Sequence, residues 1–582
     1  MPVTHVADPA PAPNPPDDPA SAVGPGRLVD HPPAPAYARL SDRVLGLADR
    51  YRRWVFAGVL VLYAAGFNAR WRPEPDSALY LAIGRNVAEG LGYTYHGKHH
   101  LLVYPGVPAM FAGVFQAFGP GSVVPHLVLM WLLGLAALGL AYRLFLLHSG
   151  RPAAVLLTFG VAISGTFYRY AFELLSDLPF LVGVLAFLVG YEAVFYRRAR
   201  AADAGGGSSV SHDGAVVGTA GRPTTGPAGY DWVLLVGGLA AAVATRPNML
   251  ALIPAAGLAL LWSVIGGGGG RRRGRTAAAH LAVAALVVLA VALFYLKDPR
   301  HRPRDPTAPV STNYVEEDQL FHLGGAKLAD MARTAFKNLP ATLEVGLARA
   351  SFGTPVLPGL NTVLAIAVMA AGVWLVRVRP LWGMWVLATV LMVTQVPKPL
   401  PRYFLGTVPV LVFGWWALTR EAEGWALRAT GSRRAAGAVF LLLFGLGGAA
   451  NVASTAAFVY EQRQVPFLGS YKEGRYASVY EAARLVEQHT PPSGAVADLS
   501  TTWVAVPAKF GRVLSFLSRR YCVEPEKFSP LDPRRHAMFV LDPTEPPEKD
   551  GSSARAARDA EPRRVPIPRW LRERGAAADP DP

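Results

Sequence analysis

The sequence predicts an all-α polytopic membrane protein with about 11 transmembrane helices and a small extracytoplasmic α/β domain at the C-terminus. Of its 582 residues, 52% are hydrophobic and only 17% are charged, whereas soluble proteins carry about 25% charged residues. Apolar runs of about 20 residues, long enough to cross a bilayer core, recur along the chain. Clusters of arginine separate many of these runs, as in cytoplasmic loops. This composition argues against a soluble enzyme.

The formal net charge is +16, yet the basic residues fall in short clusters between apolar runs and not along one face. We therefore expect the lipid bilayer as a partner and no nucleic acid. Cys522 is the only cysteine, so the chain cannot form an intramolecular disulfide.

The first 50 residues are expected to form a disordered cytoplasmic arm. Residues 1–36 are rich in proline and have no apolar run of the kind found in signal peptides. Arginines precede the first apolar run, residues 54–69, at Arg39, Arg43, Arg50, Arg52 and Arg53. Because positive flanks stay in the cytoplasm, the N-terminus is predicted inside, and residues 51–460 form the predicted transmembrane domain.

The further spans are predicted from run length and arginine flanks. They are residues 125–147, 153–172, 179–196, two short helices within 232–265, 277–296, 360–376, 381–396, 403–418 and 435–460. The run 232–265 is interrupted at Thr245-Arg246-Pro247-Asn248 and could be one kinked helix or two short ones. Arginine clusters flank it on both sides, so two spans are predicted, with 197–230 and 266–275 inside. Basic residues at 297–304 are then predicted outside, in a long loop, where the tendency of positive charge to stay in the cytoplasm is weaker.

Three further segments lie outside the predicted spans. Residues 70–124 form a first outer loop, with an interfacial helix at 77–90 and an apolar stretch at 105–119 too short to span. Residues 461–545 are predicted to be a small outer domain with a helix at 477–488 and strands at 495–498 and 537–541. Residues 546–582 are charged and proline-rich, so we expect a disordered tail.

Ionisable residues near predicted outer helix ends are the candidate site residues, because charge at membrane depth is costly. Asp76 follows the first span, although Asp76-Ser77 could instead cap the interfacial helix. Glu173 and Asp177 would share a helix face four residues apart, and two carboxylates there require a basic partner. Asp177 could also act as a cap before Pro179.

Two basic positions accompany these acids. Arg246 lies in the helix break, where it could bind an anion or extend to the membrane interface. Arg402-Tyr403 follows Lys398 at a proline-rich helix entrance and could equally be an anchoring flank. The sequence has no zinc-type ligand spacing and no nucleophile elbow.

The order of these motifs resembles that of the GT-C glycosyltransferases, in particular the family 39 group of protein O-mannosyltransferases and aminoarabinose transferases. The similar first outer loop comprises Asp76, Tyr80, Asn86, Gly90-Leu91-Gly92-Tyr93, Gly97 and Tyr104-Pro105-Gly106-Val107-Pro108. Three later motifs resemble the family's second acidic motif, its basic turn and its Arg-Tyr pair: Glu173…Asp177-Leu178-Pro179, Thr245-Arg246-Pro247 and Arg402-Tyr403. The likeness covers roughly residues 54–420.

The sequence departs from the family pattern at two places, and these departures affect the expected identity of the acceptor more than the expected type of reaction. Many relatives have Asp-Glu where this chain has Asp76-Ser77. Many also have a double proline behind a basic residue where this chain has Val103-Tyr104-Pro105-Gly106, and Lys98 could supply that missing charge.

The resemblance implies a multi-pass cell-membrane glycosyltransferase that moves a hexose or pentose from a polyprenyl-phosphate donor to an acceptor on the outer face, by an inverting displacement. The acceptor (protein, lipid or glycan) stays open. Asp76 would be the general base, and Asp177 and Glu173 would orient the acceptor or hold a divalent metal ion, a need also left open. The donor phosphate would be bound by Arg246, Arg402, Tyr403 and Lys98, with Tyr80 and Tyr104 in the substrate loop.

Two alternatives remain. A secondary transporter would also combine many spans with a broken helix pair, but inverted repeats and mid-membrane acids, which it should show, are not evident in the sequence. A catalytically degenerate protein of the same fold is favoured by the missing Asp-Glu pair.

Overall fold

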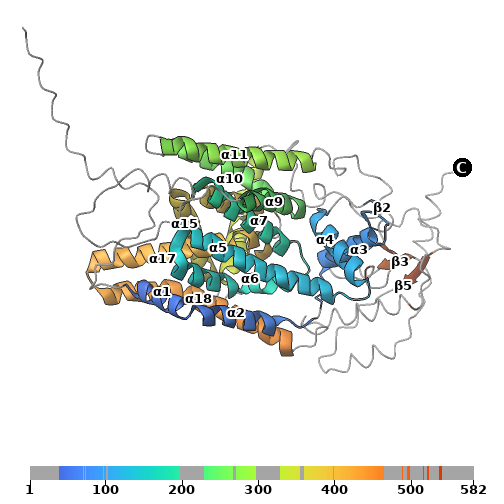
Figure 1. Cartoon of the computed structure of the whole chain (residues 1–582), viewed down its shortest axis with the longest axis horizontal. Coiled ribbons are helices and arrows are strands. Elements are labelled where there is room, and N and C mark those ends of the chain that lie inside the picture. Colours follow the sequence, from blue (N-terminus) through green and yellow to red (C-terminus); the bar gives the residue numbers. More distant parts are fainter. Residues whose placement is uncertain are drawn as a thin grey trace, which may run out of the picture.

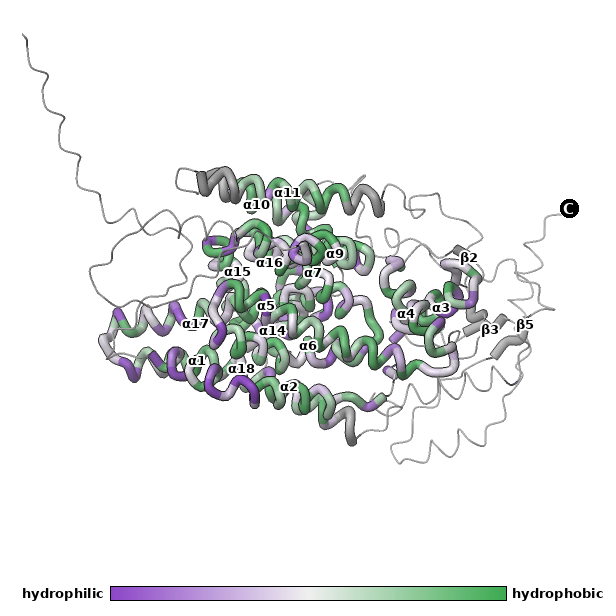
Figure 2. Tube along the Cα trace, viewed as in Figure 1, coloured by the Kyte–Doolittle hydropathy of each residue, from purple (hydrophilic) through white to green (hydrophobic). Residues whose placement is uncertain are grey.

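The computed structural model is mostly helical, with long helices running side by side along the longest axis of the molecule (Figure 1). It describes residues 39–69, 71–72, 74–95, 98–99, 103–196, 229–265, 271–295, 328–353, 360–396 and 399–464, with 488, 495–498, 516, 521–523 and 536–539. Apolar residues dominate the middle of the helices, and hydrophilic residues gather where α17 and α18 meet (Figure 2).

Helical structure begins before the first predicted span. Residues Leu40–Arg50 form helix α1, which corrects the disordered arm expected over residues 1–50; residues 1–38 lie outside the described residues. The helix is amphipathic, and its buried Ser41 donates its backbone N–H to Glu423 Oε1 at 3.3 Å. Arg420 Nη2 lies 2.8 Å from Asp42 Oδ1. These long-range partners hold α1 in place, and sequence periodicity near the N-terminus did not reveal them.

The first outer segment contains both of the predicted helical stretches. After α2 (Arg52–Gly66), helix α3 (Pro75–Ala88) confirms the helix expected at 77–90, and α4 (Gly106–Phe118) occupies the apolar stretch 105–119. A short antiparallel pair, β1 (Thr94–Tyr95) and β2 (Lys98–His99), was not predicted. A Cβ on Gly84 would lie 2.9 Å from the carbonyl oxygen of Pro108, so α3 and α4 lie in close contact.

Every predicted span coincides with helix. The remaining helices are α5 (Val124–Ala162), α6 (Gly165–Tyr170), α7 (Asp177–Tyr191), α9 (Gly229–Thr245), α10 (Leu252–Ile265), α11 (Arg271–Tyr295), α13 (Leu328–Ala341), α14 (Arg349–Phe352), α15 (Leu360–Val378), α16 (Pro380–Val393), α17 (Val408–Thr430) and α18 (Arg433–Gln464). Short 3₁₀ turns cover Pro247–Ala251 and Pro401–Thr407, and π-helical turns cover Glu192–Tyr196 and Thr342–Ala348. Within the described residues, 4 helices are long and apolar enough to cross a membrane: Val124–Ala162, Asp177–Phe195, Asn361–Val378 and Arg433–Tyr460. The total of about 11 spans stays a prediction.

Two interruptions divide the apolar runs. Gly150 has φ 74° and ψ 168°, so α5 consists of two helical pieces that match the separate runs predicted at 125–147 and 153–172. Arg246 has extended backbone between α9 and the 3₁₀ turn that starts at Pro247, which confirms the predicted break. Proline explains the second interruption, because it disfavours helical backbone at the residue before it.

Helices α7 and α9 lie in backbone contact, and this contact positions the site. A Cβ on Gly183 would lie 2.7 Å from the backbone nitrogen of Ala242, and one on Gly190 would overlap the backbone of Leu235. The order of these contacts makes the two helices antiparallel. The end of α9, next to Arg246, therefore lies beside the start of α7, at Asp177.

The described C-terminal residues form a parallel sheet in the order β4-β3-β5, from Tyr521–Val523, Ala495–Asp498 and His536–Phe539. Strands were predicted at 495–498 and 537–541, while β4 was not. The predicted helix 477–488 lies outside the described residues except for Gln488, as does the tail 546–582, so the α/β domain stays a prediction. Strands β3 and β5 lie at the same end of the molecule as α3 and α4, and the turn between α17 and α18 lies at the opposite end (Figure 1).

Candidate functional site

Asp76 is held against Arg402, and not at a cap position. It is the second residue of α3, and its Oδ2 lies 3.0 Å from Nη2 of Arg402 in the 3₁₀ turn Pro401–Thr407. Ser77 takes the capping role instead, since its Oγ accepts the backbone N–H of Glu74 at 3.1 Å. The indole N–H of Trp71 also donates to Ser77 Oγ, at 3.0 Å. The Asp76 carboxylate is therefore directed at a cation.

Asp177 forms a second ion pair, with Arg246, that is more deeply buried. The side chain of Asp177 is 1% exposed and that of Arg246 is 12% exposed, compared with 20% and 17% for Asp76 and Arg402. The contact follows from the antiparallel packing of α7 and α9, which brings the break at Arg246 to the first residue of α7. Arg246 is thus directed into the protein, and it does not extend to the membrane interface as the alternative interpretation required.

The ring of Tyr403 contacts both arginines. The Cζ atoms of Arg246 and Arg402 are each 5.7 Å from the centre of its ring, within the range of a cation–π contact. Asn248, just past the helix break, donates its side-chain N–H to the Tyr403 carbonyl at 3.3 Å. The break after α9 and the turn before α17 are therefore joined around one aromatic ring.

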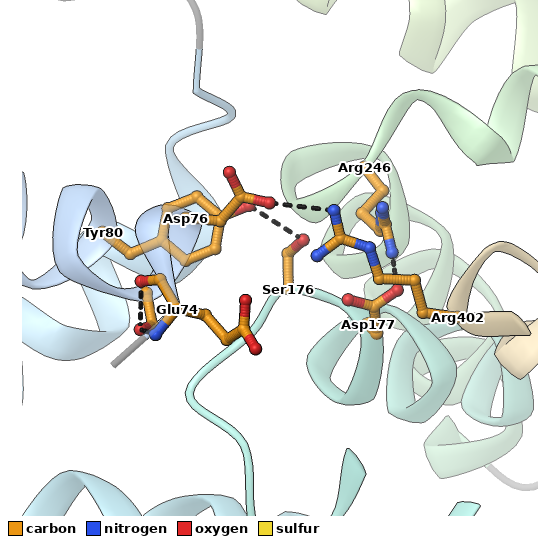
Figure 3. A network of polar contacts seen from close by, with 8 residues as sticks. Glu74, Asp76, Tyr80, Ser176, Asp177, Arg246 and Arg402 are labelled. Carbon is orange, nitrogen blue, oxygen red and sulfur yellow. Dashed lines mark hydrogen bonds and ion pairs between the residues drawn. The ribbon is translucent and has the colours of Figure 1, made fainter. Parts of the chain in front are cut away.

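Tyr80 connects α3 to the start of α7. Its hydroxyl lies 3.2 Å from Ser176 Oγ, next to Asp177, and Figure 3 shows Tyr80 beside Asp76 with Ser176 between the two ion pairs. Burial, followed by the charge of Asp76, raises the pKa of Tyr80 above its usual value. Tyr80 therefore remains a neutral phenol and can act as a hydrogen-bond donor at physiological pH.

Arg402 remains fully charged in this setting. Burial lowers its pKa, but Asp76 and then Tyr403, Tyr170 and Tyr80 raise it by more, so its pKa lies above the usual value. A permanently charged guanidinium has five N–H donors in a planar fork, so it can contact Asp76 and a second anion at the same time.

Glu173 lies apart from Asp177, so the predicted shared helix face does not form. Residue 173 precedes α7, and its carboxylate contacts Arg169 Nε at 2.8 Å and Arg72 Nη1 at 3.7 Å. The side chains of Glu173 and Arg72 are only 3% and 7% exposed. Arg72 also lies 4.6 Å from the ring centre of Phe458 in α18. This cluster ties α6 and the start of α3 to α18 beside the site.

The segment predicted as the first outer loop reaches the end of α9 through Gly106. Tyr104 is buried, and a Cβ on Gly106 would lie 2.8 Å from the carbonyl oxygen of Ala244, so the start of α4 rests on the end of α9. Lys98 pairs with Tyr95 in the β1–β2 hairpin, but its side chain lies outside the described part of the structure, as does Lys398.

The carboxylates of the site are arranged to meet arginines, and they do not surround a common point. Asp76 and Asp177 contact different arginines, and Glu173 contacts two others. Among the described residues, no group of three or more His, Cys, Asp and Glu side chains comes together that could hold a metal ion. The described donors therefore do not fit the divalent metal that the sequence left open.

Sequence reasoning missed three residues at this site. Glu74 lies two positions before Asp76, and its carboxylate extends into the space near Ser176 (Figure 3). The charge of Glu74 also acts on Tyr170, which interacts with Arg402 as well. A signal for Glu74 was present in the acidic Glu74-Pro75-Asp76 run, whereas Ser176 and Tyr170 are recognised only through their positions in space.

No protein-family model matches the chain, and no curated protein matches it either. The chain is similar to several solved structures. ArnT from Cupriavidus metallidurans in the apo state is 16% identical with a TM-score of 0.47, and the match covers 82% of this chain and 86% of that one. ArnT bound to undecaprenyl phosphate is 15% identical with a TM-score of 0.45, over 84% of this chain and 89% of that one.

The archaeal oligosaccharyltransferase AglB from Archaeoglobus fulgidus, in complex with an inhibitory peptide and a dolichol-phosphate, is also similar. It is 12% identical with a TM-score of 0.45, and the match covers 82% of this chain and 65% of that one.

Proposed function

We propose that this chain is a GT-C-like membrane glycosyltransferase that moves a sugar from a polyprenyl-phosphate donor to an acceptor on the outer face of the membrane. One observation carries the proposal. Two arginines from distant segments, Arg246 and Arg402, meet at the ring of Tyr403, and the carboxylate of Asp76 contacts Arg402. Transfer from a lipid phosphate needs these two elements, a base for the acceptor and cations for the leaving phosphate.

In the proposed reaction, an acceptor hydroxyl or amine attacks the anomeric carbon while the bond from that carbon to the phosphate oxygen breaks. The acceptor proton passes to the Asp76 carboxylate, and the electron pair of the broken bond leaves with the polyprenyl phosphate. Arg246 and Arg402 offset the charge of that phosphate, Arg402 while still in contact with Asp76. A single displacement with one base inverts the configuration of the sugar.

The remaining residues position these groups. The ring of Tyr403 lies within cation–π range of both guanidinium groups, and Tyr80 and Ser176 present neutral hydroxyl groups between the ion pairs, suited to sugar hydroxyls. Asp177 fixes Arg246, and Glu173 fixes the neighbouring loop through Arg72 and Arg169. We propose these positioning roles for Asp177 and Glu173 in place of acceptor contact.

The sequence favours an enzyme over a secondary transporter. A transporter would be expected to show inverted repeats, and none is evident in the sequence.

The test combines turnover and binding. Purified protein is incubated with a panel of polyprenyl-phosphate-linked hexoses and pentoses, and released polyprenyl phosphate is measured. Undecaprenyl phosphate serves as a binding probe that is independent of the sugar. Replacing Arg246 or Arg402 with Gln should weaken its binding about 10- to 100-fold, the value of a charge-assisted hydrogen bond.

Arg333→Gln provides the matched control, because Arg333 in α13 also pairs with an aspartate but is 82% exposed. It should bind the lipid phosphate like the wild type. No release of polyprenyl phosphate from any donor, or unchanged affinity in both Arg246→Gln and Arg402→Gln, would refute the proposed function.

A further inference from the structure

Phe516, from the C-terminal part of the chain, is inserted against helix α3. Its ring centre lies 5.3 Å from that of Trp71 in an edge-to-face arrangement at 85°. The Arg85 guanidinium carbon lies 5.0 Å from the centre of the same ring, and Arg85 Nη1 donates to the Phe516 carbonyl at 3.4 Å. Phe516 is 7% exposed and belongs to the main hydrophobic core.

These contacts engage both ends of α3. Trp71 precedes the helix, which starts at Pro75, and Arg85 lies in its last turn. A single residue that touches both ends restrains the helix against sliding along its axis and against tilting. The more than 400 residues of chain between Arg85 and Phe516 make this a tertiary contact (sequence separation 431).

Trp71, whose ring contacts Phe516, is connected by hydrogen bonds to Ser77 and Glu74, on either side of Asp76. Trp71 donates its indole N–H to Ser77 Oγ at 3.0 Å, and the Ser77 hydroxyl donates to the Glu74 carbonyl at 2.7 Å. Ser77 is fully buried. Asp76 lies between Glu74 and Ser77 in the chain, so the backbone at Asp76 is fixed on both sides. Its carboxylate then meets Arg402 at 3.0 Å.

We propose that Phe516 is a positioning residue for the transfer reaction, which holds the start of α3 so that Asp76 is set against Arg402 and the incoming acceptor. The inference rests on the proposed function. Phe516 acts through Trp71 and Ser77 and does not touch the reacting groups. Through Phe516, the C-terminal part of the chain thereby fixes the position of the general base, Asp76. Arg246 and Tyr403 are held by other elements, so donor binding should depend on Phe516 much less than turnover does.

The contact itself is tested without any activity measurement. In a Cys522→Ser background, Arg85→Cys and Phe516→Cys are combined, and a protease site is inserted within residues 205–215. After treatment of membranes with a flexible bismaleimide that spans the length of the lost Arg85 side chain, and cleavage, the two fragments should stay joined on a denaturing gel. Arg428→Cys with Phe516→Cys is the control, because Arg428 lies in the last turn of α17, at the end of the molecule opposite α3 (Figure 1).

The positioning role is tested by separating turnover from binding. With the donor that turns over in the panel above, Phe516→Ala should lower kcat about 10- to 100-fold, the cost of a base displaced by about 1 Å. Its affinity for undecaprenyl phosphate should stay within about twofold of the wild type, because only a transition-state contact is disturbed. Phe516→Tyr keeps the ring and should restore turnover. Phe118→Ala, at a phenylalanine of α4 that is 70% exposed, should resemble the wild type.

Three results would overturn the inference: no joined fragments with the 85–516 cysteine pair, a kcat in Phe516→Ala equal to that in Phe118→Ala, or equal losses of kcat and lipid-phosphate affinity. The Asp76→Asn variant distinguishes a failure of this inference from a failure of the proposed function. If Asp76→Asn is inactive and Phe516→Ala is fully active, only the positioning role of Phe516 is refuted. If Asp76→Asn is fully active, both the role of Asp76 as general base and the positioning role of Phe516 are refuted.

Discussion

Replacing Asp76 with Asn is expected to abolish turnover while leaving the fold intact. Asn has the size of Asp, and its side-chain oxygen can still accept a hydrogen bond from Arg402. It cannot take the acceptor proton. Because Ser77, and not Asp76, caps α3, the substitution leaves the helix start unchanged.

The expected magnitudes follow from the burial of the pair. Asp76 and Arg402 are 20% and 17% exposed at 3.0 Å, so water still solvates both charges in part. Exposed pairs contribute about 1 kcal/mol or less to the free energy of unfolding and breaking a buried pair costs about 3–5 kcal/mol, so we expect a loss of about 1–3 kcal/mol here. Removing a general base lowers the rate about 10²- to 10⁴-fold. The effect on rate should therefore exceed the effect on stability.

The assay measures released polyprenyl phosphate and thermal unfolding on the same preparation. Asp330→Asn is the matched control, because Asp330 pairs with Arg333 at 3.7 Å in α13 and is 57% exposed. Both variants should unfold within a few degrees of the wild type, and only Asp76→Asn should lose turnover. A folded Asp76→Asn protein with a rate within about threefold of the wild type would show that Asp76 is not the base.

Three further substitutions test the arrangement of the site. Asp177→Asn leaves Arg246, which is 12% exposed, without its charged partner, so we expect the free energy of unfolding to fall by about 3–5 kcal/mol; an unchanged Tm would contradict the buried pair. Gly106→Ala adds a Cβ 2.8 Å from the Ala244 carbonyl oxygen and should displace α4 from the Arg246 turn, weakening undecaprenyl phosphate binding. A Cβ on Gly113, in the same helix, would meet nothing within 4 Å, so Gly113→Ala should bind undecaprenyl phosphate like the wild type. Equal affinities of Gly106→Ala and Gly113→Ala would argue against a role for the contact between Gly106 and Ala244. Tyr403→Phe keeps an aromatic ring near both arginines and should bind undecaprenyl phosphate like the wild type, whereas Tyr403→Leu should bind it about 2- to 30-fold more weakly. Equal affinities in the two variants would show that the ring does not contribute to binding.

The helices themselves were predictable from local sequence. Long apolar runs predicted every described span region, and Pro247 predicted the break after Arg246. The helix at 77–90 followed from its apolar spacing. Helix α1 was missed because its stability depends on Glu423 and Arg420, which lie almost 400 residues away in the sequence (separations 382 and 378).

By itself, the sequence determined which residues could carry the chemistry, because charged side chains at helix ends and breaks stand out against apolar runs. Only the tertiary structure decided how they pair. Asp76 meets Arg402 across a separation of 326 residues, and Asp177 meets Arg246 through the glycine contacts of α7 and α9. Glu173, expected beside Asp177, binds Arg72 and Arg169 instead. Helical periodicity describes neighbours within one helix, whereas pairing between helices depends on how closely their backbones approach and in which direction they run. The contact of Phe516 with Trp71 and Arg85 has the same origin, since nothing near residue 516 in the sequence indicates its partners.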